Sequence, residues 1–172
     1  LRIAEEHIAA ILKKIDPYED LPLFCSELRK ISKPMIIAAK KIDIPGSETY
    51  LALLQKKFPH YTNTPCWSEA ELALREATKH HIIDYTPGES RFTIHAAHST
   101  EKQTHALTFL REFLKKYETT GVQNILNKSV FSLLHYLAVY PVENDHKLTD
   151  VEGRILPDVH LLKEGSTALD LA

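Results

Sequence analysis

Two lysines and an aspartate follow a short apolar segment, and this arrangement is the part of the sequence best suited to ligand chemistry. Met35 to Ala39 form a continuous apolar run, typical of a strand buried on both faces of a parallel sheet. Lys40, Lys41 and Asp43 come directly after it. Because ligands of open α/β folds bind at the carboxyl ends of the strands, these side chains are candidates for ligand contacts.

The carboxylate of Asp43 suits guanine better than adenine. It can accept hydrogen bonds from the ring N–H and from the exocyclic amine of guanine. Adenine offers no such pair of donors and would leave a shielded carboxylate unpaired. The aliphatic stem of Lys41 can cover the flat face of the base. A lysine and an aspartate at this spacing also occur in ordinary solvated turns, so the surrounding sequence has to support the nucleotide hypothesis.

Strand and helix patterns alternate after this segment. A helix is expected from Ser47, which can act as its N-cap, to about Phe58, and residues 61–66 are the next candidate strand. The sequence from Ser68 to Glu71 has the pattern of a capping box, in which the Glu71 side chain would bond back to the N-cap amide. The order strand, helix, strand, helix predicts a parallel sheet and an α/β fold.

The remaining segments are helical on both sides of this unit and β-rich at the end. Apolar residues at helical spacing predict helices over residues 5–15, 20–31, 100–117 and 122–134, with Asp20 and Thr100 as N-caps. Two β-rich runs at 136–142 and 157–162 predict a hairpin that leads into a helix at Ser166. The change of pattern places a domain boundary near residues 135–136.

Composition excludes several classes of function. The 172 residues are 44% hydrophobic and 26% charged, with a formal net charge of 21 − 23 = −2, which gives no strong attraction to DNA or to an anionic membrane. Cys25 and Cys66 predict free thiols in a reducing compartment, and we expect a cytoplasmic protein. His95 and His98 lack a Cys or carboxylate that completes a tetrahedral set, so we predict surface histidines and no metal site.

Several ordered motifs resemble the YchF/Obg-like nucleotide hydrolases, and their archaeal-type branch in particular. Residues 33–43 resemble the base-specificity motif of small-GTPase-like domains, and residues 65–75 resemble the second base-contacting loop with its helix. Four shorter motifs fit the same family in the same order, at residues 83–88, 120–123, 139–143 and 156–158. The resemblance covers nearly the whole chain and is weakest over residues 1–32.

The resemblance implies a domain organisation. Residues 1–16 would be the end of a helical insertion, and residues 17–135 the second half of a P-loop-type G domain, the part that recognises the base. Residues 136–172 would be the truncated start of a TGS domain, a β-grasp module. The phosphate-binding loop, the magnesium-binding threonine and the switch motif would lie upstream of Leu1. The chain is therefore expected to be an internal piece that is catalytically incomplete.

The resemblance also implies a function for the full-length protein. It would bind GTP, or ATP as the other candidate, together with Mg²⁺, and hydrolyse it slowly as a switch. No nucleotide is expected to bind tightly to this chain alone, and no catalytic residue or metal ligand is assigned in it. An alternative is a TGS-type module that contacts RNA or the ribosome, with degenerate nucleotide binding. The nucleotide-binding residues would be Lys40, Lys41, Asp43, Trp67, Ser68 and Glu69.

Two positions depart from the family pattern. Lys40 stands where the family has an asparagine, and a lysine has no acceptor with which to replace the asparagine's hydrogen bonds. Trp67 stands where the family has a serine that orients the motif carboxylate. The backbone amide of Ser68 can still donate to guanine O6, because that contact needs no particular side chain. We therefore expect base discrimination to persist with weakened affinity.

Overall fold

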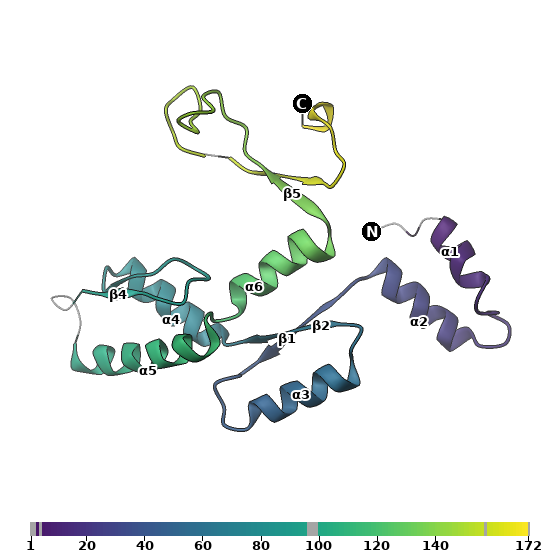
Figure 1. Cartoon of the computed structure of the whole chain (residues 1–172), viewed down its shortest axis with the longest axis horizontal. Coiled ribbons are helices and arrows are strands. Elements are labelled where there is room, and N and C mark those ends of the chain that lie inside the picture. Colours follow the sequence, from purple (N-terminus) through teal and green to yellow (C-terminus); the bar gives the residue numbers. More distant parts are fainter. Residues whose placement is uncertain (1–2, 4, 96–99, 157, 172) are drawn as a thin grey trace.

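A parallel strand–helix–strand unit forms the middle of the chain. The computed structural model describes residues 3, 5–95, 100–156 and 158–171. In it, β1 (Ile36–Lys40) and β2 (Thr62–Cys66) pair in parallel, and α3 (Ser47–Lys57) connects them (Figure 1). This confirms the predicted order and the α/β class.

The exposure of β1 differs from the prediction of a strand buried on both faces. Ala38 and Lys40 are exposed, and the other three residues of β1 are only half-buried. The reason is that, among the described residues, β1 pairs only with β2 and no helix packs extensively against it, so neither of its faces is fully covered. The apolar run was correctly predicted to be a strand, but the prediction that it is buried on both faces was wrong.

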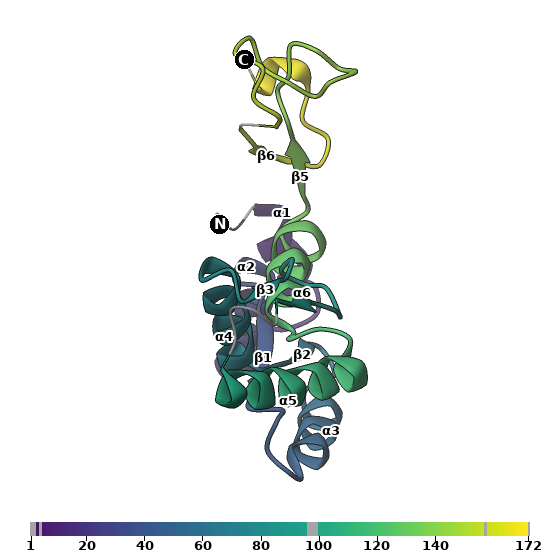
Figure 2. The same ribbon diagram turned by 90° about the vertical axis from the view of Figure 1, so that its left-hand side faces the viewer.

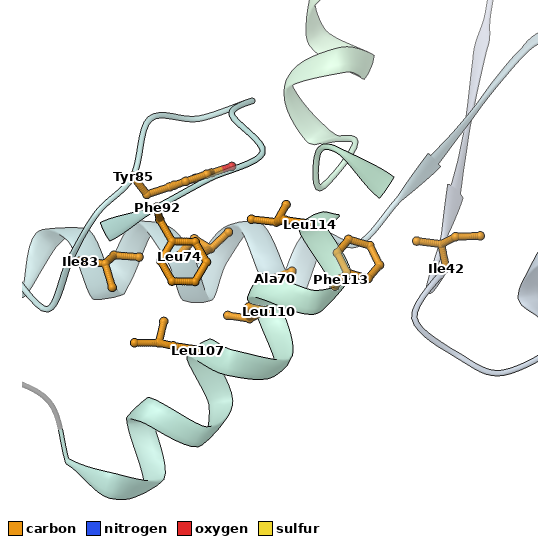
Figure 3. Packing of buried hydrophobic residues seen from close by; sticks show 10 residues of the cluster. All are labelled: Ile42, Ala70, Leu74, Ile83, Tyr85, Phe92, Leu107, Leu110, Phe113 and Leu114. Carbon is orange, nitrogen blue, oxygen red and sulfur yellow. The ribbon is translucent and has the colours of Figure 1, made fainter. Parts of the chain in front are cut away.

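The hydrophobic core lies mainly between α4 (Ser68–Lys79) and α5 (Glu101–Tyr117), under the antiparallel pair β3 (Ile83–Asp84) and β4 (Thr93–Ile94). Leu74 and Leu114 are almost completely buried here, and burying a leucine contributes about 1.5–3 kcal/mol. Ile42, from the segment after β1, belongs to the same cluster. Figure 3 shows the ten members: Ile42, Ala70, Leu74, Ile83, Tyr85, Phe92, Leu107, Leu110, Phe113 and Leu114.

Two of the predicted helix starts are confirmed. Oδ1 of Asp20 accepts a hydrogen bond from the N–H of Leu23 at 2.9 Å and caps α2 (Leu21–Ser32). Thr100 and Gln103 form the predicted capping box of α5. Both motifs are local, so the sequence alone is sufficient to place them.

The two other predicted helix starts are wrong in detail. The N-cap of α3 is Gly46, and the hydroxyl of Ser47 instead donates to the carbonyl of Ile42 at 2.8 Å. The N-cap of α4 is Trp67, without a side-chain cap, and Ser68 is the first helical residue. The predicted capping box with Glu71 is absent because buried partners from other segments bind the Glu71 carboxylate.

Beyond α5 the chain forms a helix and then a hairpin. α6 (Val122–Asn127) continues as a π-helical segment (Lys128–Leu133), and β5 (Tyr136–Val139) pairs antiparallel with β6 (His160–Lys163), as predicted. The predicted helix at Ser166 is a short 3-10 helix, Ala168–Asp170, and Pro157 lies outside the described residues. The hairpin stands beyond the end of α6, away from α5 (Figures 1 and 2).

The first helix, α1 (Glu5–Leu12), is shorter than predicted and packs against α2. No helix in the described part of the chain combines the length and apolar character that crossing a membrane requires. The domain boundary at residues 135–136 stays a prediction.

Gly121 packs directly on the carboxyl end of β2, and we expect Gly121→Ala to destabilise the protein strongly. Its φ is +84°, and an added Cβ would lie 2.0 Å from the carbonyl oxygen of Pro65. The control is Gly165→Ala, because Gly165 has a φ of +86° with no atom within 4 Å of the added Cβ.

Left-handed strain costs roughly 1–2 kcal/mol at both positions, and the backbone clash adds to it only at Gly121. Urea unfolding of the two variants measures the difference. If Gly121→Ala and Gly165→Ala lowered the free energy of unfolding equally, the clash with Pro65 would contribute nothing measurable to the loss.

Candidate functional site

Two connections leave the sheet at the same edge. Lys40, the last residue of β1, pairs in register with Cys66, the last residue of β2. The β1–α3 loop (residues 41–46) and the β2–α4 junction (Trp67 and Ser68) therefore begin side by side at the carboxyl edge of the parallel pair. The structure thus brings the two predicted groups of site residues to one place, although they are 27 residues apart in sequence (Lys40 to Trp67, 67 − 40).

The β1–α3 loop is tightly fixed. Lys41 has a left-handed backbone with φ +60°, and its carbonyl accepts a hydrogen bond from the N–H of Ile44. The side chain of Ile42 is only 4% exposed and enters the core. The hydroxyl of Ser47 binds the carbonyl of Ile42. These contacts hold the residue between Ile42 and Ile44, which is Asp43, in one position.

Asp43 carries a shielded oxygen without a hydrogen bond. Its Oδ1 is buried and has no partner among the described residues, while the residue as a whole is half-buried. A buried acceptor left unpaired costs about 1–3 kcal/mol, so this oxygen is suited to a donor from a ligand. The neighbouring Lys40 and Lys41 are exposed, and neither forms an ion pair within the described part of the chain.

The β2–α4 junction is held by its backbone and by the indole of Trp67. The N–H of Trp67 donates to the carbonyl of Thr120 at 2.8 Å. The indole packs edge-on against Phe113 and Phe109 of α5, with ring centroids 4.7 and 5.8 Å away. This packing directs the side chain to α5, and its Nε1 is buried without a partner among the described residues.

The first turn of α4 offers backbone donors at the same edge. Ser68 and Glu69 are both exposed and occupy this turn, where amide groups have no partner inside the helix. Glu69 lies at the positive end of the helix dipole, which favours a carboxylate there. The chemistry available at the junction is therefore hydrogen-bond donation from the backbone, and the N–H of Ser68, the first residue of α4, is the first such donor after β2.

A contact that sequence reasoning missed connects α3 to α5. Oε1 of Glu48, in the first turn of α3, accepts a hydrogen bond from the Tyr117 hydroxyl at 2.6 Å and pairs with Lys116 at 2.8 Å. The hydrogen bond from Lys116 lowers the pKa of Glu48 below its ordinary value, and the one from Tyr117 adds to the effect. These contacts hold α3, the helix that follows Asp43, against α5. Glu48 and Tyr117 are 69 residues apart in sequence, so no local pattern predicts their contact.

A buried polar network centred on Glu71 was also missed. Oε1 of Glu71 accepts from Arg75 at 2.7 Å, and Oε2 accepts from Tyr85 at 2.9 Å and from Thr120 at 2.7 Å. Burial acts to raise the pKa of Glu71, but the hydrogen bonds from Thr120, Arg75 and Tyr85 outweigh it, so the pKa lies below its ordinary value. The spacing of Glu71 and Arg75 on one helix face was the only signal in the sequence.

Two ionisable groups near the edge stay neutral at physiological pH. Burial raises the pKa of Tyr85 to about 12, and burial likewise raises the pKa of the Cys66 thiol, against an opposing effect of Lys40. Neither group therefore supplies a base or a thiolate at neutral pH.

The histidines form no metal site in the part of the chain that the structure describes. No group of three or more His, Cys, Asp or Glu residues is arranged there to hold a metal ion. Nε2 of His95 instead lies 2.9 Å from Oδ2 of Asp84, and His98 lies outside the described residues.

A parallel strand–helix–strand unit with polar connections at its carboxyl edge defines the class, an α/β protein with a candidate ligand-binding edge. Residues 38–144, more than half of the chain, match the family described as "Obg-like GTPase YGR210-like, G4 motif-containing domain". The chain belongs to this family.

Two relatives support the assignment. The chain is 42% identical over 178 aligned residues to the "uncharacterized GTP-binding protein MJ1332" of Methanocaldococcus jannaschii, covering 100% of this chain and 45% of that protein. It also resembles the crystal structure of a GTP-binding protein from Pyrococcus horikoshii OT3, with a TM-score of 0.64, 33% identity, and coverage of 98% of this chain and 45% of that one. The chain thus spans less than half the length of both relatives.

We expect Glu71 to make stability depend on pH. Its pKa is lowered in the folded protein, so its contribution is complete above its ordinary pKa of 4.5 and is lost as the pH falls through the folded value. Glu71→Gln removes the charge and should destabilise the protein most at neutral pH. Urea unfolding at pH 7 and pH 3 should show the gap between wild type and variant narrowing in acid.

The exposed neighbour Glu69 supplies the control, since Glu69→Gln should leave the free energy of unfolding close to that of the wild type at pH 7. A gap for Glu71→Gln that is the same at both pH values would contradict the role assigned to the carboxylate charge.

Proposed function

We propose that this chain is the base-recognition part of a guanine-nucleotide-binding switch protein of the YchF/Obg-like group. The observation that carries the proposal is the shielded, unpaired Oδ1 of Asp43, in a fixed loop at the sheet edge shared with Ser68. The names of the two relatives, both GTP-binding proteins, support the same ligand. A fixed acceptor beside exposed backbone donors matches the edge of guanine, which presents donors and an acceptor side by side.

Each site residue has a defined role in this proposal. Asp43 accepts hydrogen bonds from the ring N–H and the exocyclic amine of guanine, and the Ser68 amide donates to O6. The stem of Lys41 covers one face of the base. Lys40, Glu69 and the backbone of Trp67 border the nucleotide. The indole of Trp67 does not stack on the base in this arrangement, because it packs against α5.

The phosphate end of the nucleotide requires residues from a longer protein. We propose that the remainder, corresponding to the part of the relatives that this chain does not span, pairs with the free edge of β1 and completes a P-loop-type G domain. It would supply the phosphate-binding loop and hold Mg²⁺, for which the described residues offer no ligand cluster. Hydrolysis depends on positioning by that loop and metal, so we expect none from this chain alone.

Asp43→Asn tests the proposed reading of the base. An asparagine presents an N–H donor in place of one acceptor oxygen, so the affinity for GTP should fall about tenfold or more while the weaker affinity for ATP stays the same. Fluorescence titration of the protein at its full natural length, with GTP and ATP, measures both. The matched control Asp145→Asn removes a charge from an exposed loop and should leave both affinities unchanged.

Two results would defeat the role of Asp43. One is equal affinity of the wild-type protein for GTP and ATP. The other is an Asp43→Asn variant that retains the wild-type preference.

The hairpin supports a second candidate function, contact with RNA or the ribosome through a TGS domain. β5 and β6 form an antiparallel pair followed by a capped helical turn at Thr167, and Leu137, Val159 and Leu161 expose apolar side chains on or beside it. In this alternative the nucleotide site is degenerate, as the replacement of the family asparagine by Lys40 suggests, and the hairpin carries the main activity.

We expect the full-length protein to cosediment with ribosomes at low salt if the hairpin belongs to such a domain, because charge contacts with RNA are strongest there. Sedimentation with GTP, with GDP and without nucleotide would show whether the nucleotide controls docking. The absence of the protein from the ribosome pellet at low salt under all three conditions would count against this candidate.

A further inference from the structure

Thr120 links the β2–α4 junction to the buried carboxylate of Glu71. Its carbonyl oxygen accepts the hydrogen bond from the N–H of Trp67, and its hydroxyl donates to Oε2 of Glu71 at 2.7 Å. Thr120 is 1% exposed and Glu71 4% exposed, so water does not compete for these contacts. The next residue, Gly121, packs on the carbonyl of Pro65 and fixes the distance between this segment and β2.

Glu71 also holds the junction through its own backbone. Its N–H donates to the carbonyl of Trp67 at 3.3 Å. That carbonyl belongs to the same planar peptide unit as the N–H of Ser68, so its direction determines the direction of the Ser68 N–H. The two residues that bind the backbone of Trp67 are therefore bonded to each other through their side chains.

We propose that Thr120, held by Glu71, is a positioning residue that aims the Ser68 amide at O6 of guanine. The inference rests on the proposed guanine-binding function of this edge. Thr120 acts through the backbone of Trp67 and has no contact with the nucleotide itself. Thr120 binds the N–H of Trp67, which precedes the peptide unit that carries the Ser68 N–H, so a shift at Thr120 reaches that unit through the backbone of Trp67. Because a hydrogen bond is sensitive to direction, a small rotation of the Trp67–Ser68 peptide unit weakens the contact with O6 while the contacts made by Asp43 persist.

The test compares two nucleotides and two substitutions in the protein at its full natural length. The triphosphate of 2-aminopurine riboside lacks both O6 and the ring N–H, so it keeps only the exocyclic amine as a donor to Asp43 and cannot bind the Ser68 amide as GTP does. Thr120→Val removes the hydroxyl and keeps the shape, and Thr120→Ser keeps the hydroxyl. We expect Thr120→Val to raise the Kd for GTP about tenfold and to leave that for the 2-aminopurine nucleotide unchanged. Thr120→Ser should behave as the wild type with both.

Tyr85→Phe controls for a general loss of stability. It removes another hydrogen bond to the same Oε2 of Glu71 without touching the junction, so it should lower the free energy of unfolding and leave both Kd values unchanged. The proposal is overturned if Thr120→Val weakens both nucleotides equally or neither, or if Tyr85→Phe weakens GTP as much as Thr120→Val does.

Hydrogen exchange of the Trp67 amide separates this inference from the proposed function. The amide should exchange faster in Thr120→Val than in Thr120→Ser, whether or not a nucleotide binds. If the wild-type protein did not prefer GTP over ATP, the proposed function would be defeated. Hydrogen exchange of the Trp67 amide would still measure whether Thr120 positions the backbone of Trp67. Equal exchange of Trp67 in the two variants would then overturn the positioning role as well.

Discussion

The parallel register of β1 and β2 is the constraint on which the candidate site depends. Lys40 lies opposite Cys66, so the two connections that follow start at the same height on the same edge. A register shifted by one residue would also turn every side chain of β2 to the other face, because side chains alternate along a strand. Cys66 would then leave the buried side, and Trp67 would lose its position against Phe113.

Ile42 explains how a polar loop can be rigid. It lies between Lys41 and Asp43, yet its side chain belongs to the buried cluster around α4 and α5. The free energy gained by burying this side chain therefore holds the two flanking polar groups at the surface. The sequence alternation of lysine, isoleucine and aspartate is thus a means of anchoring the loop, and the left-handed backbone of Lys41 lets the chain turn there.

The parts of the fold that depend on neighbouring residues could be predicted from the sequence. The strand at Ile36, the caps at Asp20 and Thr100, and the antiparallel hairpin all follow from local patterns. The residues that fix the site could not, because their partners are distant. Glu71 has the spacing of a capping residue, but Tyr85 and Thr120, 14 and 49 residues away, bind its carboxylate. A buried acceptor is satisfied by the strongest donors within reach, and tertiary structure decides which these are.

The candidate site residues were proposed from their types and from the family resemblance, and the structure shows where Trp67, one departure from the family pattern, places its side chain. A tryptophan in place of the family serine would fill the base site if its side chain pointed there. Instead Phe109 and Phe113 provide an aromatic surface on α5 that holds the indole edge-on.

The indole anchors Trp67 on α5, and the backbone of Trp67 is the part that offers hydrogen-bonding groups at the junction. A contact made by the backbone does not depend on which side chain is present, so this position can vary as long as the peptide unit keeps its direction. In the arrangement we propose, specificity then depends on the residues that hold the backbone of Trp67, because Thr120 binds its N–H and Glu71 binds its carbonyl. Both residues are buried and bonded to each other, and Thr120 is far from Trp67 along the sequence although it contacts it in space. A comparison of loop residues alone therefore does not reveal them.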